Sequence, residues 1–322
     1  ARRLYAGRRE ELVKIAAARK AEFAAWAKEN PEKAAELQSW IDGKVPEIDY
    51  KAIAHKPNVA TRTASADVLA VLGEKLKNMI VSSADLSNSD KTEAFIKKCG
   101  GFIEPGNFNG SFLQAGVAEL TMASIMNGIA LHGGMFGACG TFFVFSDYMK
   151  PAIRMTALME LPVKYVWTHD SFRVGEDGPT HEPVEQEAQI RLLEEMKNHS
   201  GKRSMLVIRP ADSAEENTDT PTGLIFTRQD VEDIPSVSGD RYADALQMEK
   251  GGYAVVNCDD PDIVLVGNGS DVMLLVKAAK VLADDGVKVR VVSVPAIGLF
   301  MDQPKEYREK LIPRDKPTFG KT

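Results

Sequence analysis

The residues best suited to chemistry lie in one polar loop, Thr168 to Gln186, with the sequence THDSFRVGEDGPTHEPVEQ. Its two histidines, His169 and His181, can exchange a proton near neutral pH, and several carboxylates surround them. The loop follows the apolar run Pro162–Trp167, which is typical of a buried strand. Because ligand chemistry in an open α/β sheet takes place where strands end, the loop is a candidate catalytic site. A solvated connection with incidental histidines is the alternative.

Polar side chains follow other predicted strands as well. Asp85 and Ser89 come after one strand, and Arg228 comes after another. The carboxyl ends of parallel strands lie at one edge of a sheet, so these groups can converge with the histidine loop. Glu119 lies in the first turn of a predicted helix, where the helix dipole favours an acid. That electrostatic effect alone would account for a glutamate at this position.

Alternating helices and strands are predicted to position these groups. Residues 1–43 predict two helices, with Asn30 as the N-cap of the second and Pro31 in its first turn, and Lys44–Asn58 predicts a linker. The following order is then expected: helix Ala66–Leu76, strand Met79–Ser82, helix Ala118–His132, strand Ala138–Phe145, helix Ser146–Met159, strand Val163–Trp167, helix Val184–Asn198, strand Met205–Arg209 and strand Gly223–Thr227. This alternation predicts the α/β class, with a mostly parallel sheet covered by helices on both faces.

A second unit is predicted after the polar, glycine-containing stretch Glu232–Tyr253. There the pattern predicts strand Asp262–Gly267, helix Asp271–Asp285 and strand Lys288–Pro295, which are too few elements to close a domain. The chain begins without methionine and stops soon after this run, so a piece of a longer polypeptide is expected.

Composition excludes several classes of function. The chain has 322 residues, 44% of them hydrophobic, which suits one large or two ordinary globular domains. A net charge of −6 and the lack of a basic stripe argue against a nucleic-acid partner. No membrane-spanning run or signal-peptide core is found, so no membrane partner is predicted. Cys99, Cys139 and Cys258 are widely spaced, which predicts a cytoplasmic protein without a disulfide framework or zinc site.

Several strings, in this order, resemble the transketolases, which are thiamine-diphosphate enzymes: ATRTAS (60–65), SSADLSNSDKT (82–92), QAGVAELTMASIMNGIALHGG (114–134), GTFFVFSDYMKPAIRMTALM (140–159), the GEDGPTHEPVE loop, IRPAD (208–212) and TRQD (227–230). The resemblance implies the thiamine-diphosphate-binding fold followed by a partial α/β C-terminal domain. It assigns residues 1–57 to the helical tail and linker of a diphosphate-binding domain, 58–235 to the pyrimidine-binding domain, and 236–322 to an incomplete C-terminal domain.

The resemblance also implies how the cofactor is held. Glu119 matches the glutamate that hydrogen-bonds a ring nitrogen of the aminopyrimidine and favours its imino tautomer. Phe142, Phe145 and Tyr148 match aromatic walls of that ring, and Asp85 matches an acid beside the cofactor. Ligands for Mg²⁺ or Ca²⁺ are expected in the diphosphate-binding domain, so no metal ligand is assigned here.

Substrate contacts follow from the same match. His169 and His181 match histidines that handle hydroxyl and carbonyl oxygens of the substrate, and Asp177 matches an acid that recognises a sugar hydroxyl. Arg62, Ser89 and Arg228 match the sugar-phosphate grip, where a guanidinium fork suits phosphate oxygens. Without the family, a surface ion pair would be the simpler explanation for each arginine.

Two departures from the family wording leave the acceptor preference open. Ala118 and Leu120 flank Glu119 where the family often has Arg and His, and Phe172-Arg173 replaces a common Ile-Gly.

The resemblance implies the C-terminal portion of a transketolase, which moves a two-carbon ketol unit from a ketose phosphate to an aldose phosphate in the pentose phosphate pathway. It implies a homodimer formed through the pyrimidine-binding domain, or a complex with an N-terminal diphosphate-binding subunit, and an isolated chain that is inactive. The alternatives are a dihydroxyacetone synthase and a catalytically silent partner subunit with the same fold.

Overall fold

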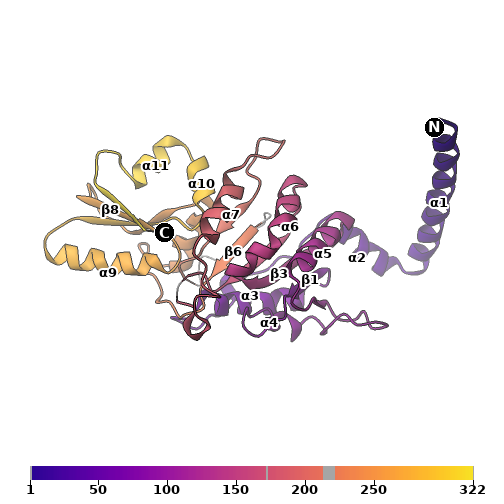
Figure 1. Ribbon diagram of the computed structural model, residues 1–322, viewed down its shortest axis with the longest axis horizontal. Helices are drawn as coiled ribbons and strands as arrows, with labels where there is room; N and C mark the ends of the chain where they lie inside the picture. The colour runs from indigo at the N-terminus through magenta and orange to yellow at the C-terminus, as the bar shows by residue number, and fades with distance from the viewer. Residues whose placement is uncertain (1, 172, 213–221, 322) are drawn as a thin grey trace.

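The computed structural model describes residues 2–171, 173–212 and 222–321 (Figure 1). Phe172, one of the departures from the family wording, lies outside these residues. The centre of the structure is a six-stranded sheet in the order β2-β1-β3-β4-β6-β5. The strands are β1 (Met79–Ser83), β2 (Phe112–Gln114), β3 (Phe136–Phe142), β4 (Lys164–Thr168), β5 (Leu206–Ile208) and β6 (Thr222–Phe226). All their pairings are parallel, so the predicted α/β class is confirmed.

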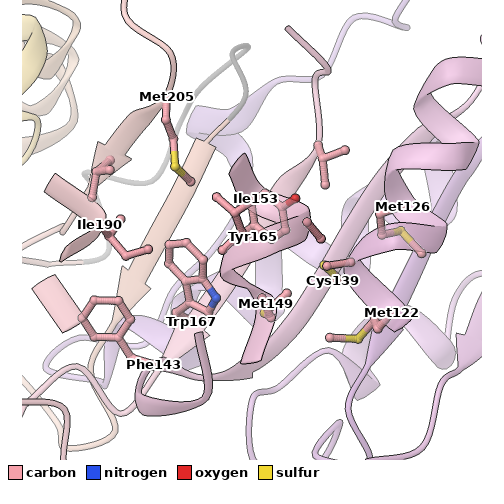
Figure 2. Close-up of a cluster of buried hydrophobic side chains, with 14 of the residues drawn as sticks. Met122, Met126, Cys139, Phe143, Met149, Ile153, Tyr165, Trp167, Ile190 and Met205 are labelled. Atoms are coloured by element: carbon pink, nitrogen blue, oxygen red, sulfur yellow. The ribbon is translucent and has the colours of Figure 1, made fainter. Parts of the chain in front are cut away.

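Helices cover both faces of this sheet. On one face lie α5 (Glu119–His132), α6 (Ser146–Leu158) and α7 (Gln186–Glu195), and on the other lie α3 (Thr61–Lys75) and α4 (Glu93–Ile96). Alternate residues of β4 point to opposite faces, and Tyr165 and Trp167 turn toward α6, with parallel rings 5.5 Å apart. Figure 2 shows them among Met149, Ile153 and Ile190, so the larger core supports the strands that end at the histidine loop.

Most predicted boundaries are shifted by a few residues in the structure, and two of these shifts bear on the arrangement of the sheet edge. The α3 helix begins at Thr61 rather than Ala66, since the Thr61 backbone N–H donates to the Thr227 hydroxyl at 2.9 Å. This contact places Arg62 in the first turn of α3. The β3 strand ends at Phe142 rather than Phe145, and residues 143–145 form a 3₁₀ turn that leads directly into α6.

The second unit is larger than the sequence pattern predicted. Its sheet has four strands in the order β10-β8-β9-β7: β7 (Tyr253–Val256), β8 (Ile263–Gly267), β9 (Val289–Ser293) and β10 (Thr318–Lys321). The predicted strand–helix–strand run is confirmed as β8, α9 (Asp271–Asp284) and β9. The β7 and β10 strands were missed, as were α8 (Arg241–Ala245), α10 (Ile297–Asp302) and α11 (Lys305–Leu311). Short elements of four to seven residues carry too little periodicity to be recognised.

Two helices precede the central sheet, as predicted. The α1 helix (Arg2–Glu29) projects away from the rest of the chain, and α2 (Pro31–Ile41) connects it to the body (Figure 1). The linker that follows contains only the 3₁₀ turn Tyr50–Ala52. In the described parts of the chain, no helix combines the length and apolar character needed to cross a membrane.

Candidate active site

Five segments that are distant in sequence meet at the carboxyl edge of the central sheet. His169 directly follows β4, Phe142 ends β3, and Arg228 lies two residues after β6. The register aligns these ends, since Phe142 pairs with Thr168 and Thr168 pairs with Phe226. The first turn of α3 and the loop after β1 complete the edge through hydrogen bonds described below. Strand ends therefore bring together residues that the sequence places far apart.

His169 is buried and held in an unusual backbone conformation. Its side chain is 1% exposed, and its φ of 63° lies in the left-handed region that non-glycine residues rarely adopt. Its Nδ1 lies 2.9 Å from the Thr168 hydroxyl, and its Nε2 lies 3.8 Å from Asp177 Oδ2. Burial, followed by the charges of Arg62 and Arg228, lowers the pKa of His169 to about 3. The imidazole is therefore neutral at physiological pH, and one nitrogen can donate while the other accepts.

An aromatic shelf lies against the two histidines. Phe142 stacks on His169 with ring centroids 3.7 Å apart, and it stacks on Phe145 at 5.9 Å with the planes only 9° apart. His181 meets the Phe145 ring edge-on at 5.3 Å, and the Tyr148 ring lies 6.1 Å from Phe145, tilted by 30°. Tyr148 is 62% exposed, so the shelf ends in a ring that a flat ligand can reach. The aromatic residues and both histidines thus form one contiguous surface.

Arg62 and Arg228 lie beside the histidine loop and repel each other. Burial and then the Arg228 charge lower the pKa of Arg62. Arg62 Nη1 donates to the backbone carbonyl of Ser89 at 2.8 Å, while its buried Nε has no partner among the described residues. Arg228 Nη2 donates to both carboxylate oxygens of Glu176, at 3.2 and 3.1 Å. A bound anion would relieve the repulsion between the two guanidinium groups. Ser89 contributes its backbone carbonyl, which holds the Arg62 side chain.

Asp90, which the sequence did not single out, holds the loop after β1. Its buried carboxylate accepts hydrogen bonds from the Ser83 hydroxyl at 2.6 Å and from the Thr92 N–H and hydroxyl at 2.9 and 2.7 Å. Burial raises the pKa of Asp90 to about 6. A Cβ on Gly140 of β3 would lie 2.7 Å from Asp90 Oδ2, so only glycine fits there. Asp90 therefore fixes the segment that presents Asp85 and the Ser89 carbonyl.

Glu119 and Asp85 lie toward the β1–β2 side of the edge. Glu119 is the first residue of α5 and is 8% exposed, and none of the described residues donates a hydrogen bond to its carboxylate. Asp85 also has a left-handed φ, of 63°, and its Oδ1 accepts a hydrogen bond from Gln114 Nε2 at 2.7 Å. Within the described residues, no hydrogen bond or ion pair joins Glu119 to the histidine loop. A carboxylate that the described residues leave without a donor suits a ligand that brings its own N–H.

These residues fit an aminopyrimidine ring better than they fit a metal ion. The Glu119 carboxylate can accept from a ring N–H, and the shelf of Phe142, Phe145 and Tyr148 can stack on a flat heterocycle. Over the residues that the structure describes, no cluster of three or more His, Cys, Asp or Glu side chains is arranged to hold a metal.

Comparison with known proteins agrees with this geometry. The family described as "Transketolase, pyrimidine binding domain" matches residues 57–231, and "Transketolase-like TK C-terminal domain" matches residues 251–320. The transketolase of Geobacillus stearothermophilus is 41% identical over 306 residues, which are 91% of this chain and 44% of that protein. A Pichia stipitis transketolase, solved in complex with sedoheptulose-7-phosphate, is 37% identical with a TM-score of 0.81 and covers 95% of this chain and 46% of that one.

A third relative is shorter. A split-gene transketolase, described as an inactive beta4 tetramer, is 25% identical with a TM-score of 0.55, over 74% of this chain and 72% of that one. By contrast, this chain spans less than half the length of the curated transketolases that it matches. The pyrimidine-binding match alone covers more than half of the 322 residues. The chain therefore belongs to the transketolase family, and it corresponds to the C-terminal portion of these enzymes.

Proposed function

We propose that the chain forms the pyrimidine-binding side of a transketolase active site, which transfers a two-carbon ketol unit from a ketose phosphate to an aldose phosphate in the pentose phosphate pathway. The observation that carries the proposal is the stacking of neutral His169 on Phe142 beside the charged pair Arg62 and Arg228. An aromatic shelf for a flat cofactor, a neutral imidazole for oxygen atoms and a cationic pair for phosphate occur together at one sheet edge.

The cofactor proposed for this site is thiamine diphosphate, which supplies a thiazolium carbon that adds to the substrate carbonyl. In this chain, Glu119 would hold the aminopyrimidine through a hydrogen bond to a ring nitrogen, and Phe142, Phe145 and Tyr148 would stack against the ring. Asp85 would lie beside the cofactor, at the position fixed by Gln114. We assign the Mg²⁺ or Ca²⁺ ligands to a diphosphate-binding domain supplied by another part of the enzyme.

The histidines would handle the oxygen atoms of the substrate. Because Nδ1 of His169 bonds the Thr168 hydroxyl, Nε2 is the nitrogen left to bond a hydroxyl or carbonyl oxygen. The Asp177 carboxylate, 3.8 Å from that nitrogen, would accept from a sugar hydroxyl bound at the same place. His181, on the edge of the Phe145 ring, would bond a second substrate oxygen.

The phosphate group is proposed to bind between Arg62 and Arg228, with the Ser89 segment as the support of Arg62. The sedoheptulose-7-phosphate complex of the Pichia stipitis relative supports a sugar phosphate as substrate. The same arginine pair favours sugar phosphates as substrates, and it does not by itself separate a transketolase from a dihydroxyacetone synthase, which transfers the unit to formaldehyde.

The chain is proposed to act with a partner. Apolar side chains near Glu119 and the shelf are exposed: Val117 is 81%, Leu120 46% and Val184 84% exposed. We propose that this surface packs on a diphosphate-binding domain, in a homodimer or in a complex with a separate subunit, and that the chain alone is inactive. The inactive tetramer of the split-gene relative supports this dependence.

We further propose domain limits of 1–57, 58–235 and 236–322, with the first segment as tail and linker of the diphosphate-binding domain. Three free cysteines in the described residues support a cytoplasmic setting.

The proposed function is tested by assembling the chain with a polypeptide that carries the diphosphate-binding domain. Ketol transfer to ribose 5-phosphate should require both polypeptides, thiamine diphosphate and Mg²⁺. A silent partner subunit would behave differently: the transfer rate would be unchanged when His169→Ala replaces the native chain.

A further inference from the structure

The strained backbone of His169 needs an external restraint. A buried non-glycine residue with φ of 63° keeps that conformation only when its surroundings enforce it. Stacking on Phe142 fixes the ring, and the hydrogen bond to Thr168 comes from the preceding residue on the same strand. Neither contact fixes the direction in which the chain leaves His169. The next residue, Asp170, makes the contact that does so.

Asp170 is tied to Arg209 by a buried ion pair. One carboxylate oxygen, Oδ2, accepts from Arg209 Nε at 3.1 Å and from Nη2 at 2.8 Å. The two side chains are 0% and 4% exposed. The other oxygen of Asp170, Oδ1, has no hydrogen-bond partner among the described residues. The buried charge of Asp170 therefore depends on Arg209 for its compensation.

Arg209 is itself held by the second unit. Its backbone N–H donates to the Pro295 carbonyl at 3.0 Å, and its own carbonyl accepts from the Gly269 N–H at 3.1 Å. Its Nη1 donates to Asn268 Oδ1 at 2.9 Å. Gly269 has a φ of 54°, and a Cβ there would lie 2.7 Å from Arg209 Nε. Asn268 and Gly269, which follow β8, thus pack closely around Arg209 and hydrogen-bond to it. Neither residue is among those proposed to bind the substrate.

We propose that Asp170 and Arg209 are positioning residues for His169, and that the second unit contributes to catalysis because its residues Asn268, Gly269 and Pro295 hold Arg209 in place. The proposal rests on the proposed function only in taking His169 as a substrate-binding histidine. Removing the ion pair would let the chain after His169 relax from its left-handed conformation. The imidazole would then leave the shelf for solvent.

The position of His169 can be followed without an activity assay. The chain has five histidines, so imidazole proton and carbon resonances can be assigned, with His169→Gln identifying the signal of interest. In the native chain this signal should not titrate between pH 5 and 8, because the pKa of His169 is lowered to about 3. In Asp170→Asn it should titrate near pH 6.5, the ordinary value for a solvated imidazole.

Asp212 provides a matched control. This buried residue accepts two hydrogen bonds from Arg241, at 2.7 and 2.8 Å, and so resembles Asp170 in environment and partner. Its Oδ2 also accepts from the Ile234 N–H at 3.1 Å, which ties it to the segment before α8. Asp212→Asn should lower the melting temperature but leave the His169 signal unchanged. If both variants release His169, or if Asp170→Asn does not, the pair stabilises the fold without positioning the histidine.

A second variant acts from the other side of the contact. Gly269→Ala changes no charge but places a methyl group against Arg209. It should also make the His169 signal titrate, and an unchanged signal would overturn the role of the second unit. This variant also serves if Asp170→Asn does not fold.

In the assembled enzyme, both Asp170→Asn and Gly269→Ala should lower kcat by roughly tenfold to a hundredfold. The KM for the phosphorylated acceptor should change less than about threefold, because the arginine pair is not altered. If His169 responds to the variants in the NMR experiment but the assembled enzyme transfers no ketol unit, the proposed function fails and the positioning inference stands.

Discussion

Phe142 and His169 stack with ring centroids 3.7 Å apart, although one ends β3 and the other follows β4. The contact joins the surface proposed for the cofactor to the residue proposed to bind the substrate. Burial in this contact also keeps the imidazole neutral. The chemistry of the histidine therefore depends on the packing of the neighbouring strand, and the following predictions test separate parts of this arrangement.

Glu119→Gln should lower turnover of the assembled enzyme by about two to three orders of magnitude without unfolding it, since an amide preserves shape but not the carboxylate's preference for a protonated ring nitrogen. Hydrogen–deuterium exchange at the thiazolium carbon of bound cofactor measures this step directly. Glu185→Gln, at an exposed position, is the control and should exchange at the native rate. Equal exchange in the Glu119 variant would remove this residue from the mechanism.

Arg62→Ala and Arg228→Ala should each raise the KM for ribose 5-phosphate by roughly tenfold to a hundredfold. A charge-assisted bond to phosphate contributes about 1.5–3 kcal/mol, and it is made in both the ground and the transition state. Transfer to glycolaldehyde, which has no phosphate, should hardly change. Arg154→Ala, at an exposed position of α6, is the control and should behave like the native chain. Equal losses on both acceptors would show that the arginines maintain the structure instead.

The isolated chain should bind thiamine and thiamine diphosphate with similar, weak affinities, within about threefold of each other. The groups proposed here for the cofactor, Glu119 and the shelf, face its aminopyrimidine ring, while a pyrophosphate needs a cation to offset its charge. Calorimetric titration with Mg²⁺ present measures both affinities. A diphosphate form that binds more than tenfold tighter would place a diphosphate site in this chain.

Asp90 should make stability depend on pH in a predictable direction. Its pKa is raised from 3.8 to about 6, so between these values the native state holds a proton that the unfolded chain has lost. The contribution of Asp90 is therefore fully present below pH 3.8 and is lost as the pH rises through 6. The free energy of unfolding of the native chain, minus that of Asp90→Asn, should fall by up to about 3 kcal/mol between pH 4 and 7. Urea titrations at these pH values measure the difference, and a constant difference would contradict the assignment.

The sequence predicted five of the six strands of the central sheet, because these strands are apolar and the helices between them are periodic. It missed β2 (Phe112–Gln114) and α4 (Glu93–Ile96), which have three and four residues and are too short to show a period. It also predicted which groups gather at the edge, since residues that follow parallel strands must lie at the same side. It could not predict the Asp170–Arg209 pair or the hydrogen bonds of Asp90, because these depend on side-chain contacts between segments that only the folded chain brings together. The IRPAD motif contains Arg209, yet nothing in the motif indicates that Gly269 packs against this side chain and hydrogen-bonds to its backbone.

The end of β3 leaves the aromatic shelf without a flexible connection. Phe142 passes through one 3₁₀ turn into α6 with no intervening loop, and Phe143 is buried in the core beside Trp167. The aromatic wall therefore has no hinge of its own and moves only with the core of the sheet. The histidine loop beside it contains a single short 3₁₀ turn among the described residues of 169–185. In the proposed enzyme, sugars of different lengths would therefore be accommodated by the part of the histidine loop beyond Asp170, against a stationary aromatic surface.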